Sequence, residues 1–280
     1  MTPPRIVATD LDGTLLTSAR TVSPRTRDAL RLARESGAEI VFVTARPPRG
    51  VRAVAEQAGV TGTAICSNGA IVYDLETDEI TESLPLDPAA ARRAALALAE
   101  ALPGVGLAVE TGRDVLVEAA YTRRVPEDLA FYREVTALFG TAEPPAGAAA
   151  GSLAGPVAGP VVKLLAHSPA HTADEMIAAV PAVLAGLAEI TQSGESGLVE
   201  ISAPGVTKAA TLDRLCRARG VAAGEVVAFG DMPNDLAVLA YAGAGYAMAN
   251  AHEAVLAAVS RRTLSNDEDG VAAVLERLYG

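Results

Sequence analysis

Residues 5–15 read RIVATDLDGTL, and the rest of the chain is organised around this stretch. An apolar run typical of a buried strand ends at Asp10 and Asp12, which Gly13 follows in a turn. Residues two apart in an extended chain share a face, with Cα atoms roughly 6–7 Å apart. Carboxylates this close repel each other unless a cation or a shared proton lies between them. An acidic, solvated turn would explain a bare D-x-D, but after an apolar run D-x-D-G-T indicates a function.

The following stretch alternates between expected helices and strands. Ser23 and Pro24 are typical of a helix start, and the strand expected at 39–43 ends in Thr44. A helix to about Gly59 and a strand at 63–66 come next. This order is typical of a parallel sheet with helices on its faces. Ligands of such sheets bind beyond the carboxyl ends of the strands, which is where the two acids and Thr44 lie.

The pattern changes after residue 71 and returns after residue 200. A hairpin is expected around 71–81, and residues 141–160 are rich in Gly, Pro and Ala. We expect a second, α+β domain at 84–200, inserted into a doubly wound α/β core made of 1–83 and 201–280. The expected elements of this inserted domain are helices at 88–102 and 170–185 and strands at 105–109, 115–119, 161–165, 189–192 and 198–202.

The second core segment brings another acidic group to a strand end. A helix is expected from about 207 to 219, with Lys208 at its start, and a strand at 225–229. That strand ends in Asp231, Asn234 and Asp235. A further strand at 245–250 and a terminal helix complete the core pattern.

Composition limits the partners and the compartment. The chain has 280 residues, half of them apolar, and a formal charge of −11 from 23 basic and 34 acidic residues. This charge argues against a nucleic acid or an anionic membrane as partner. Cys66 and Cys216 lie far apart and suggest no disulfide framework. With no apolar run of transmembrane length and no signal-peptide pattern, we expect a cytoplasmic protein.

Lysine and asparagine are rare, which makes their positions informative. Only Lys163 and Lys208 are lysines, and the four asparagines are Asn68, Asn234, Asn250 and Asn266. In a chain biased toward Arg and Ala, such residues are expected to be required where they stand. Lys163 has two interpretations: its stem covers apolar surface while its amine reaches water, or the amine contacts the non-reacting end of a substrate.

The acids, Thr44 and Lys208 predict phosphoryl-transfer chemistry if the topology brings them to one sheet edge. Several carboxylates at one point favour a hard divalent cation, and Mg²⁺ is the usual one. A threonine hydroxyl at a strand end can bind a phosphate oxygen, and a lysine can neutralise a phosphoryl group. A carboxylate nucleophile beside a second carboxylic acid can transfer a phosphoryl group through an aspartyl-phosphate.

These motifs resemble those of the haloacid dehalogenase superfamily phosphatases, and most of all those of the Cof-like sugar phosphatases. The resemblance covers both core segments in the family's order. It implies that the inserted domain at 84–200 is the family's α/β cap, where the match is weakest. The family usually has Gly where this chain has Ala45. The matching stretches begin at Asp10 (DLDGTLL), Thr44 (TAR), Ser67 (SNGA), Gly205 (GVTK), Gly230 (GDMPND), Ala247 (AMANA) and Ser265 (SNDEDG).

The resemblance implies a role for each matching residue. Asp10 would be the nucleophile, and Asp12 the acid that protonates the leaving group and then activates water. Mg²⁺ would be held by Asp10, Asp231 and the backbone carbonyl of Asp12, with Asp235 or Asn234 in support. Binding of the phosphoryl group is expected from Thr44, Lys208 and Asn234, and substrate contacts from Arg46, Asn68 and Lys163.

The preferred hypothesis is a Mg²⁺-dependent phosphomonoesterase acting on a small phosphorylated metabolite such as a sugar phosphate. A sugar phosphomutase of the same superfamily is one alternative, since it would return the phosphoryl group to a sugar. A non-catalytic module that binds a phosphorylated ligand is another, although it would not need Asp10, Asp12, Lys208 and Asp231 together. A response-regulator receiver also has acids and a lysine, but the inserted domain makes this chain far too long for one.

Overall fold

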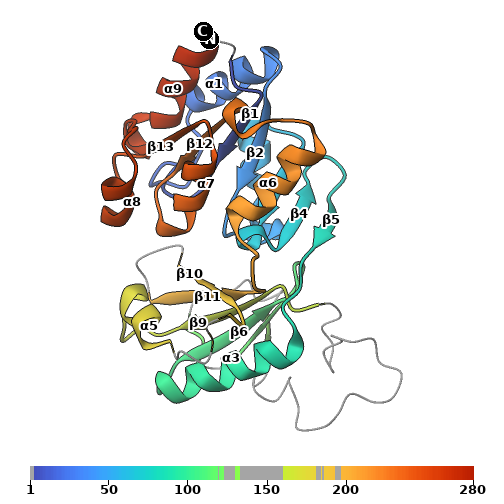
Figure 1. The fold of residues 1–280 in the computed structure, drawn as a ribbon, viewed down its shortest axis with the longest axis vertical. Helices are drawn as coiled ribbons and strands as arrows, with labels where there is room; N and C mark the ends of the chain where they lie inside the picture. Colours follow the sequence, from blue (N-terminus) through green and yellow to red (C-terminus); the bar gives the residue numbers. More distant parts are fainter. Residues whose placement is uncertain are drawn as a thin grey trace. The chain divides into compact units, whose positions relative to one another are not determined.

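The computed structural model of the chain describes residues 3–118, 120–122, 130–132, 160–180, 184, 186–192 and 197–280. The chain divides into two compact units (Figure 1). Unit 1 consists of Met1–Glu82 and Thr207–Gly280, and unit 2 of Ser83–Val206. Of the Gly, Pro and Ala-rich stretch at 141–160, all but the last residue lies outside the described residues.

Unit 1 contains a seven-stranded sheet in the order β13-β12-β1-β2-β3-β4-β5. The five strands from β13 to β3 are parallel, and β4 runs antiparallel to β3. The parallel strands β1 and β12 are buried along their whole length, which explains why they are continuous apolar runs. The strands are β1 (Ile6–Thr9), β2 (Glu39–Val43), β3 (Thr63–Cys66), β4 (Ile71–Asp74), β5 (Glu79–Ser83), β12 (Val226–Gly230) and β13 (Ala244–Ala247).

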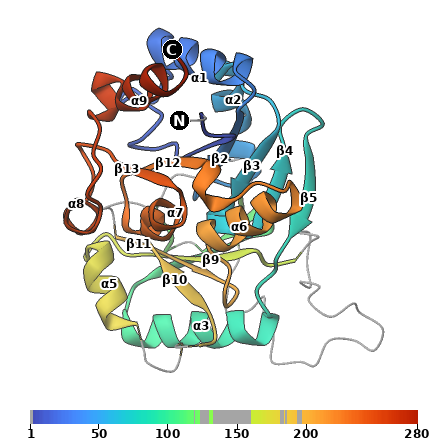
Figure 2. The ribbon, with the colours of Figure 1, turned by 45° about the horizontal axis from the view of Figure 1, so that its top comes forward.

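Helices cover both faces of this sheet, so the predicted doubly wound α/β core is confirmed. Helices α1, α2 and α9 lie on one face and α6 and α7 on the other (Figure 2). The start of α1 follows the sequence signal, because the Ser23 hydroxyl accepts a hydrogen bond from the Thr26 amide at 3.0 Å. The helices are α1 (Pro24–Glu35), α2 (Arg52–Ala58), α6 (Lys208–Ala218), α7 (Leu236–Tyr241), α8 (Glu253–Ala258) and α9 (Gly270–Tyr279).

Unit 2 contains a six-stranded sheet in the order β10-β11-β9-β6-β7-β8. Helices α3 and α5 pack on one of its faces, and their apolar side chains form a common core with it (Figure 1). No helix in the described part of the chain has both the length and the apolar character needed to cross a bilayer. The elements are α3 (Pro88–Ala101), β6 (Gly106–Glu110), β7 (Val115–Val117), β8 (Ala130–Tyr132), β9 (Lys163–His167), α5 (Ala173–Ala179), β10 (Glu189–Thr191) and β11 (Leu198–Ser202).

Several boundaries in unit 2 differ from those expected: for example, α5 ends at Ala179 and not at 185, and β7 ends at Val117 and not at 119. Helix α5 begins at Ala173 instead of 170, because Thr172 and Glu175 form a capping box that fixes its start. Strand β9 begins two residues later than expected, at Lys163, and the carbonyl of Val161 accepts a hydrogen bond from the Leu86 amide at 2.7 Å. The expected domain boundary at 200 falls inside β11, which pairs with β9 and belongs to unit 2.

Candidate active site

The acidic residues of unit 1 follow neighbouring parallel strands. Asp10 directly follows β1, and Asp231 directly follows β12. The two strands pair in register, and the amide of Asp10 donates to the carbonyl of Phe229 at 3.1 Å. Thr44 directly follows β2, the other neighbour of β1. The carboxyl ends of the strands therefore bring Asp10, Thr44 and Asp231 to one sheet edge, as the sequence pattern predicts.

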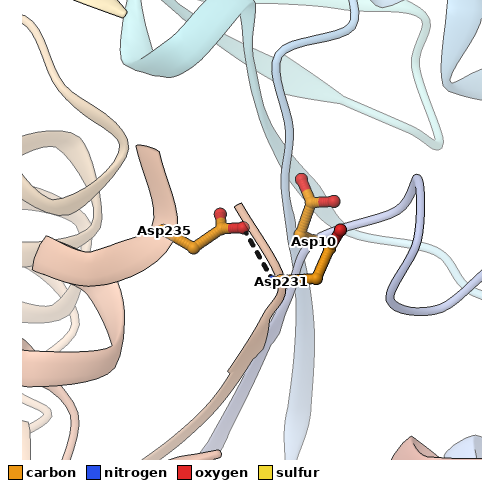
Figure 3. Close-up of side chains that lie close together, drawn as sticks. All are labelled: Asp10, Asp231 and Asp235. Carbon is orange, nitrogen blue, oxygen red and sulfur yellow. Dashed lines mark hydrogen bonds between the residues drawn. The ribbon is translucent and has the colours of Figure 1, made fainter. Parts of the chain in front are cut away.

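Three carboxyl groups form a buried cluster at this edge. Asp10, Asp231 and Asp235 each offer an oxygen, and these oxygens lie within 4.8 Å of one another (Figure 3). The residues come from the end of β1, the loop after β12 and the short helix η5 (Pro233–Asp235). Their oxygen-only donor set matches the preference of a hard divalent cation.

Lys208 is the cation of this cluster. Its Nζ atom donates to Oδ1 of Asp10 and to Oδ1 of Asp235, at 2.7 Å in each case. The lysine is the first residue of α6, and the Thr207 side chain caps that helix by accepting from the Ala210 amide. Because its side chain is only 2% exposed, the ammonium is held between two carboxylates with little access to water.

The acidic groups of the cluster outnumber its one basic group. Three carboxyl groups surround one ammonium, and burial raises the pKa of Asp10 well above its ordinary value, although Lys208 opposes the rise. Burial, together with the Asp235 carboxylate, raises the pKa of Asp231 to about 7. Burial lowers the pKa of Lys208, but Asp10 and Asp235 more than offset this effect and raise it. A bound divalent cation would stabilise the ionised carboxylates and so oppose these upward shifts of their pKa values.

Hydrogen bonds fix the orientation of each carboxyl group. Oδ2 of Asp235 accepts from the amides of Asp231 and Met232 at 3.1 Å, which ties η5 to the end of β12 (Figure 3). Oδ1 of Asp231 accepts from the Thr14 hydroxyl at 2.6 Å. Gly13 has a φ of +78°, and a Cβ atom there would overlap the Asp231 carboxylate. The D-x-D-G-T motif therefore needs glycine for both the turn and the close approach.

Thr44, Asn68 and Asn234 are the other polar residues predicted for the site. The Thr44 hydroxyl oxygen accepts from the Arg46 amide at 3.1 Å. Asn234 donates from Nδ2 to Oδ1 of Asn68 at 3.0 Å, and Asn68 has a left-handed backbone with a φ of 56°. The Oδ1 atom of Asn234 is buried and, in the described part of the chain, has no hydrogen-bond partner. This amide oxygen is available to a cation or to one of its water ligands.

Asp12 lies apart from the three clustered carboxyl groups. Its side chain is 50% exposed, and both of its oxygens accept from Arg46, Oδ2 from Nε at 2.6 Å and Oδ1 from Nη2 at 2.5 Å. Arg46 had been predicted to contact the substrate, and the structure places its guanidinium on Asp12. In the predicted metal site, Asp12 contributes its backbone carbonyl. Its carboxyl group is therefore available for proton transfer.

Lys163 belongs to unit 2, where it pairs with two acids of the same sheet. It is 1% exposed in β9, and its Nζ atom lies 3.0 Å from Oε1 of Glu200 and 3.5 Å from Oε2 of Glu110. Strands β11 and β6, which flank β9, carry these two acids. The interpretation that the amine reaches water is therefore wrong, because the amine is buried between two carboxylates. Its suggested contact with a substrate stays a prediction.

We expect Lys163→Met to lower the free energy of unfolding by about 3 kcal/mol, because it leaves two buried carboxylates without their ammonium. Urea unfolding followed by circular dichroism measures this loss. A variant that also carries Glu110→Gln and Glu200→Gln removes all three charges and should recover most of the stability. Equal stability of wild type and Lys163→Met would show that the buried pair contributes nothing.

Three residues of the site region had no assigned role in the sequence analysis. Thr14 binds Asp231, as described above. Nδ2 of Asn250 donates to the carbonyl of Gly13 at 2.8 Å, and Nδ2 of Asn266 donates to the carbonyl of Leu16 at 2.8 Å. These bonds hold the turn that follows Asp10 and Asp12. The rarity of asparagine was the available signal, but it could not show what the side chains bind.

Comparison with known proteins agrees with this arrangement. A family model for haloacid dehalogenase-like hydrolases matches residues 7–275. The pyridoxal phosphate phosphatase YbhA of Escherichia coli (strain K12) is 30% identical over 276 residues, which cover 96% of each chain. The 5-amino-6-(5-phospho-D-ribitylamino)uracil phosphatase YitU of Bacillus subtilis (strain 168) is 28% identical, over 99% of this chain and 98% of the relative.

The fold is shared with solved structures as well. A haloacid dehalogenase-like hydrolase from Bacteroides thetaiotaomicron has a TM-score of 0.75 and 26% sequence identity, over 99% of this chain and 100% of the other. The relatives are named as phosphatases, and the match extends over nearly the whole chain, so this protein is an enzyme that hydrolyses phosphoric monoesters. The chain belongs to the haloacid dehalogenase-like hydrolase family, as its motifs indicated.

Proposed function

We propose that the protein is a Mg²⁺-dependent phosphomonoesterase that acts on small phosphorylated metabolites through an aspartyl-phosphate on Asp10. The observation that carries this proposal is the contact of Lys208 with Asp10 inside the cluster of buried carboxyl groups. A buried nucleophile beside a fixed ammonium can approach a phosphate dianion, whose charge a carboxylate alone would repel.

The residues present fit a magnesium ion. Carboxylate oxygens of Asp10 and Asp231 would hold it, with Asp235 and the buried Oδ1 of Asn234 in support. Both oxygens of Asp235 already accept hydrogen bonds, which favours a supporting role for this residue. A bound Mg²⁺ supplies positive charge that offsets the charge of the phosphoryl group and of the surrounding carboxylates.

In the first step, a carboxylate oxygen of Asp10 attacks the phosphorus atom and forms a new P–O bond. The ester P–O bond breaks, and the proton of Asp12 goes to the leaving oxygen, which departs as an alcohol. Lys208 stays beside Asp10 and compensates negative charge on the transferring group. The products of this step are the alcohol, the aspartyl-phosphate and the Asp12 carboxylate.

In the second step, the Asp12 carboxylate takes a proton from water as the water oxygen attacks phosphorus. The bond between phosphorus and the Asp10 oxygen breaks, which releases inorganic phosphate and restores both aspartates. One side chain can serve as acid and then as base because the first step leaves it deprotonated. Its partly exposed position agrees with this role, since water must reach it.

Three side chains are assigned to the phosphoryl group, namely Thr44, Lys208 and Asn234. The Thr44 hydroxyl accepts from a backbone amide, which leaves its own hydrogen to be donated to a phosphate oxygen. Asn234 carries an amide near the cluster and reaches Asn68 with its Nδ2 atom. This small number of donors suits a terminal phosphate monoester better than an extended polyanion, in agreement with the net charge of −11.

The substrate class follows from the relatives and the chemistry together. One relative is named for pyridoxal phosphate and another for a phosphorylated ribitylaminouracil, both of which are small phosphate monoesters. We propose a compound of this class, sugar phosphates included, as the substrate of this enzyme.

A panel of phosphate monoesters tests the proposed function. It should contain sugar phosphates, pyridoxal phosphate and nucleoside monophosphates, each assayed with Mg²⁺ for released inorganic phosphate. We expect free phosphate from several members without any bisphosphate activator. Phosphate that appears on a second sugar instead of in solution would identify a mutase, and the absence of turnover on every member would contradict the proposal.

A further inference from the structure

We propose that Arg46 is a positioning residue that holds the carboxyl group of Asp12 in the orientation needed for proton transfer. The inference rests on the proposed function, in which Asp12 is the acid and base of the reaction. In this proposal Arg46 contacts a catalytic side chain of the enzyme, Asp12, and not the substrate.

The geometry of the pair is that of a fork. The Nε and Nη2 atoms of Arg46 donate to separate oxygens of Asp12, at 2.6 Å and 2.5 Å. Two parallel bonds fix the plane of a carboxylate, whereas a single bond would let it rotate. Asp12 lies in the turn after β1 and is half exposed, so without such a partner its side chain would be free to change rotamer.

Arg46 is itself anchored at three other points. Its Nη1 atom donates to the carbonyl of Gly50 at 2.9 Å, and its amide donates to the Thr44 hydroxyl at 3.1 Å. Its carbonyl accepts from the Ser67 amide at 2.9 Å. All three side-chain nitrogens of Arg46 therefore donate to protein groups. This arrangement favours a role in holding Asp12 over a role in binding substrate. The Thr44 bond also ties this support to a predicted phosphate-binding residue.

Stability alone does not explain the pair. The Arg46 side chain is 25% exposed and that of Asp12 is 50% exposed. Ion pairs this accessible contribute little to folding, because water competes for both charges. We therefore expect Arg46→Gln to shift the melting temperature by less than about 3 °C. A large effect on the proton-transfer step would then come from orientation and not from unfolding.

Aryl phosphates whose leaving groups differ in basicity provide the test. They offer the same contacts to the enzyme, but p-methoxyphenolate needs protonation much more than p-nitrophenolate does. Values of kcat/KM, which report the transfer step, are measured with both for the wild type and its variants. We expect Arg46→Gln to lower kcat/KM by about thirtyfold on p-methoxyphenyl phosphate and by less than about threefold on p-nitrophenyl phosphate.

Conservative and matched variants sharpen the comparison. Arg46→Lys keeps the charge without the fork, so its selective loss should be intermediate. Arg25 makes a similar bidentate pair with Glu276, at 2.9 and 2.7 Å, on helices α1 and α9. Arg25→Gln should therefore leave both kcat/KM values unchanged. In an Asp12→Asn background, Arg46→Gln should have less than about a twofold effect, because the group through which it acts is gone.

Two results would overturn the inference. One is an equal loss on both aryl phosphates with a raised KM, which would make Arg46 a substrate contact. The other is an undiminished effect of Arg46→Gln in the Asp12→Asn background. Failure of the proposed function is seen separately in the same assay, as a wild-type enzyme inactive on both substrates or an Asp10→Asn variant that remains active.

Discussion

Asp10→Asn is expected to lower phosphatase turnover by at least about a thousandfold, a barrier increase of roughly 4 kcal/mol. The amide keeps the size of the side chain but cannot act as a nucleophile toward phosphorus. The fold should persist, because Lys208 keeps its 2.7 Å contact with Asp235 and the variant removes one of three crowded carboxyl groups. Steady-state hydrolysis of p-nitrophenyl phosphate, with a melting curve of each protein, measures both effects.

Asp213→Asn is the matched control for this variant. Asp213 lies on α6, as Lys208 does, but it is paired with Arg217 at the helix surface. The same chemical change there should leave turnover unaltered. If Asp10→Asn retained more than about a hundredth of the wild-type rate, Asp10 would not be the nucleophile.

Removal of divalent cations is expected to lower activity by at least about a hundredfold, roughly 2.7 kcal/mol of barrier. Without a cation, three buried carboxyl groups face a phosphate dianion, and Lys208 compensates only part of this negative charge. Mg²⁺ should restore the rate after chelation by EDTA. Ca²⁺ should restore it poorly, because it favours longer bonds and more ligands than an octahedral site provides.

Metal binding can also be measured without catalysis. A ligand that binds only the folded chain raises its melting temperature, so Mg²⁺ should stabilise the chelated wild-type protein. Asp231→Asn should weaken that shift, since it removes one of the clustered carboxylates. EDTA saturated with Mg²⁺ beforehand is the control for other effects of the chelator. Full activity in free chelator would contradict the metal assignment.

The core of the fold could be predicted because its signals are local. Buried parallel strands must be apolar on both faces, and helices between them begin at capping residues such as Ser23. The order of these signals then places Asp10, Thr44 and Asp231 at one edge without knowledge of any contact. The same reasoning found Lys208, because a lysine at a helix start was unusual in this chain.

The partners of individual side chains could not be predicted in this way. Lys163 was expected to reach water or a substrate, yet it pairs with acids on the two neighbouring strands. Strand order in the unit 2 sheet decides this contact, and periodicity within one strand carries no information on it. The fork between Arg46 and Asp12 joins two loops in the same non-local manner. Contacts that depend on pairing of distant segments require the folded structure.

The central claim is that the phosphoryl group passes through the carboxylate of Asp10, and chemical trapping tests it most directly. Enzyme mixed with p-nitrophenyl phosphate and Mg²⁺ is quenched in acid and reduced with borohydride, which converts an acyl phosphate of aspartate to homoserine. Peptide mass spectrometry then locates the reduced residue. We predict homoserine at position 10, dependent on substrate and absent from Asp10→Asn. A phosphoryl group on another residue, or product formation with no trapped residue at all, would contradict the account.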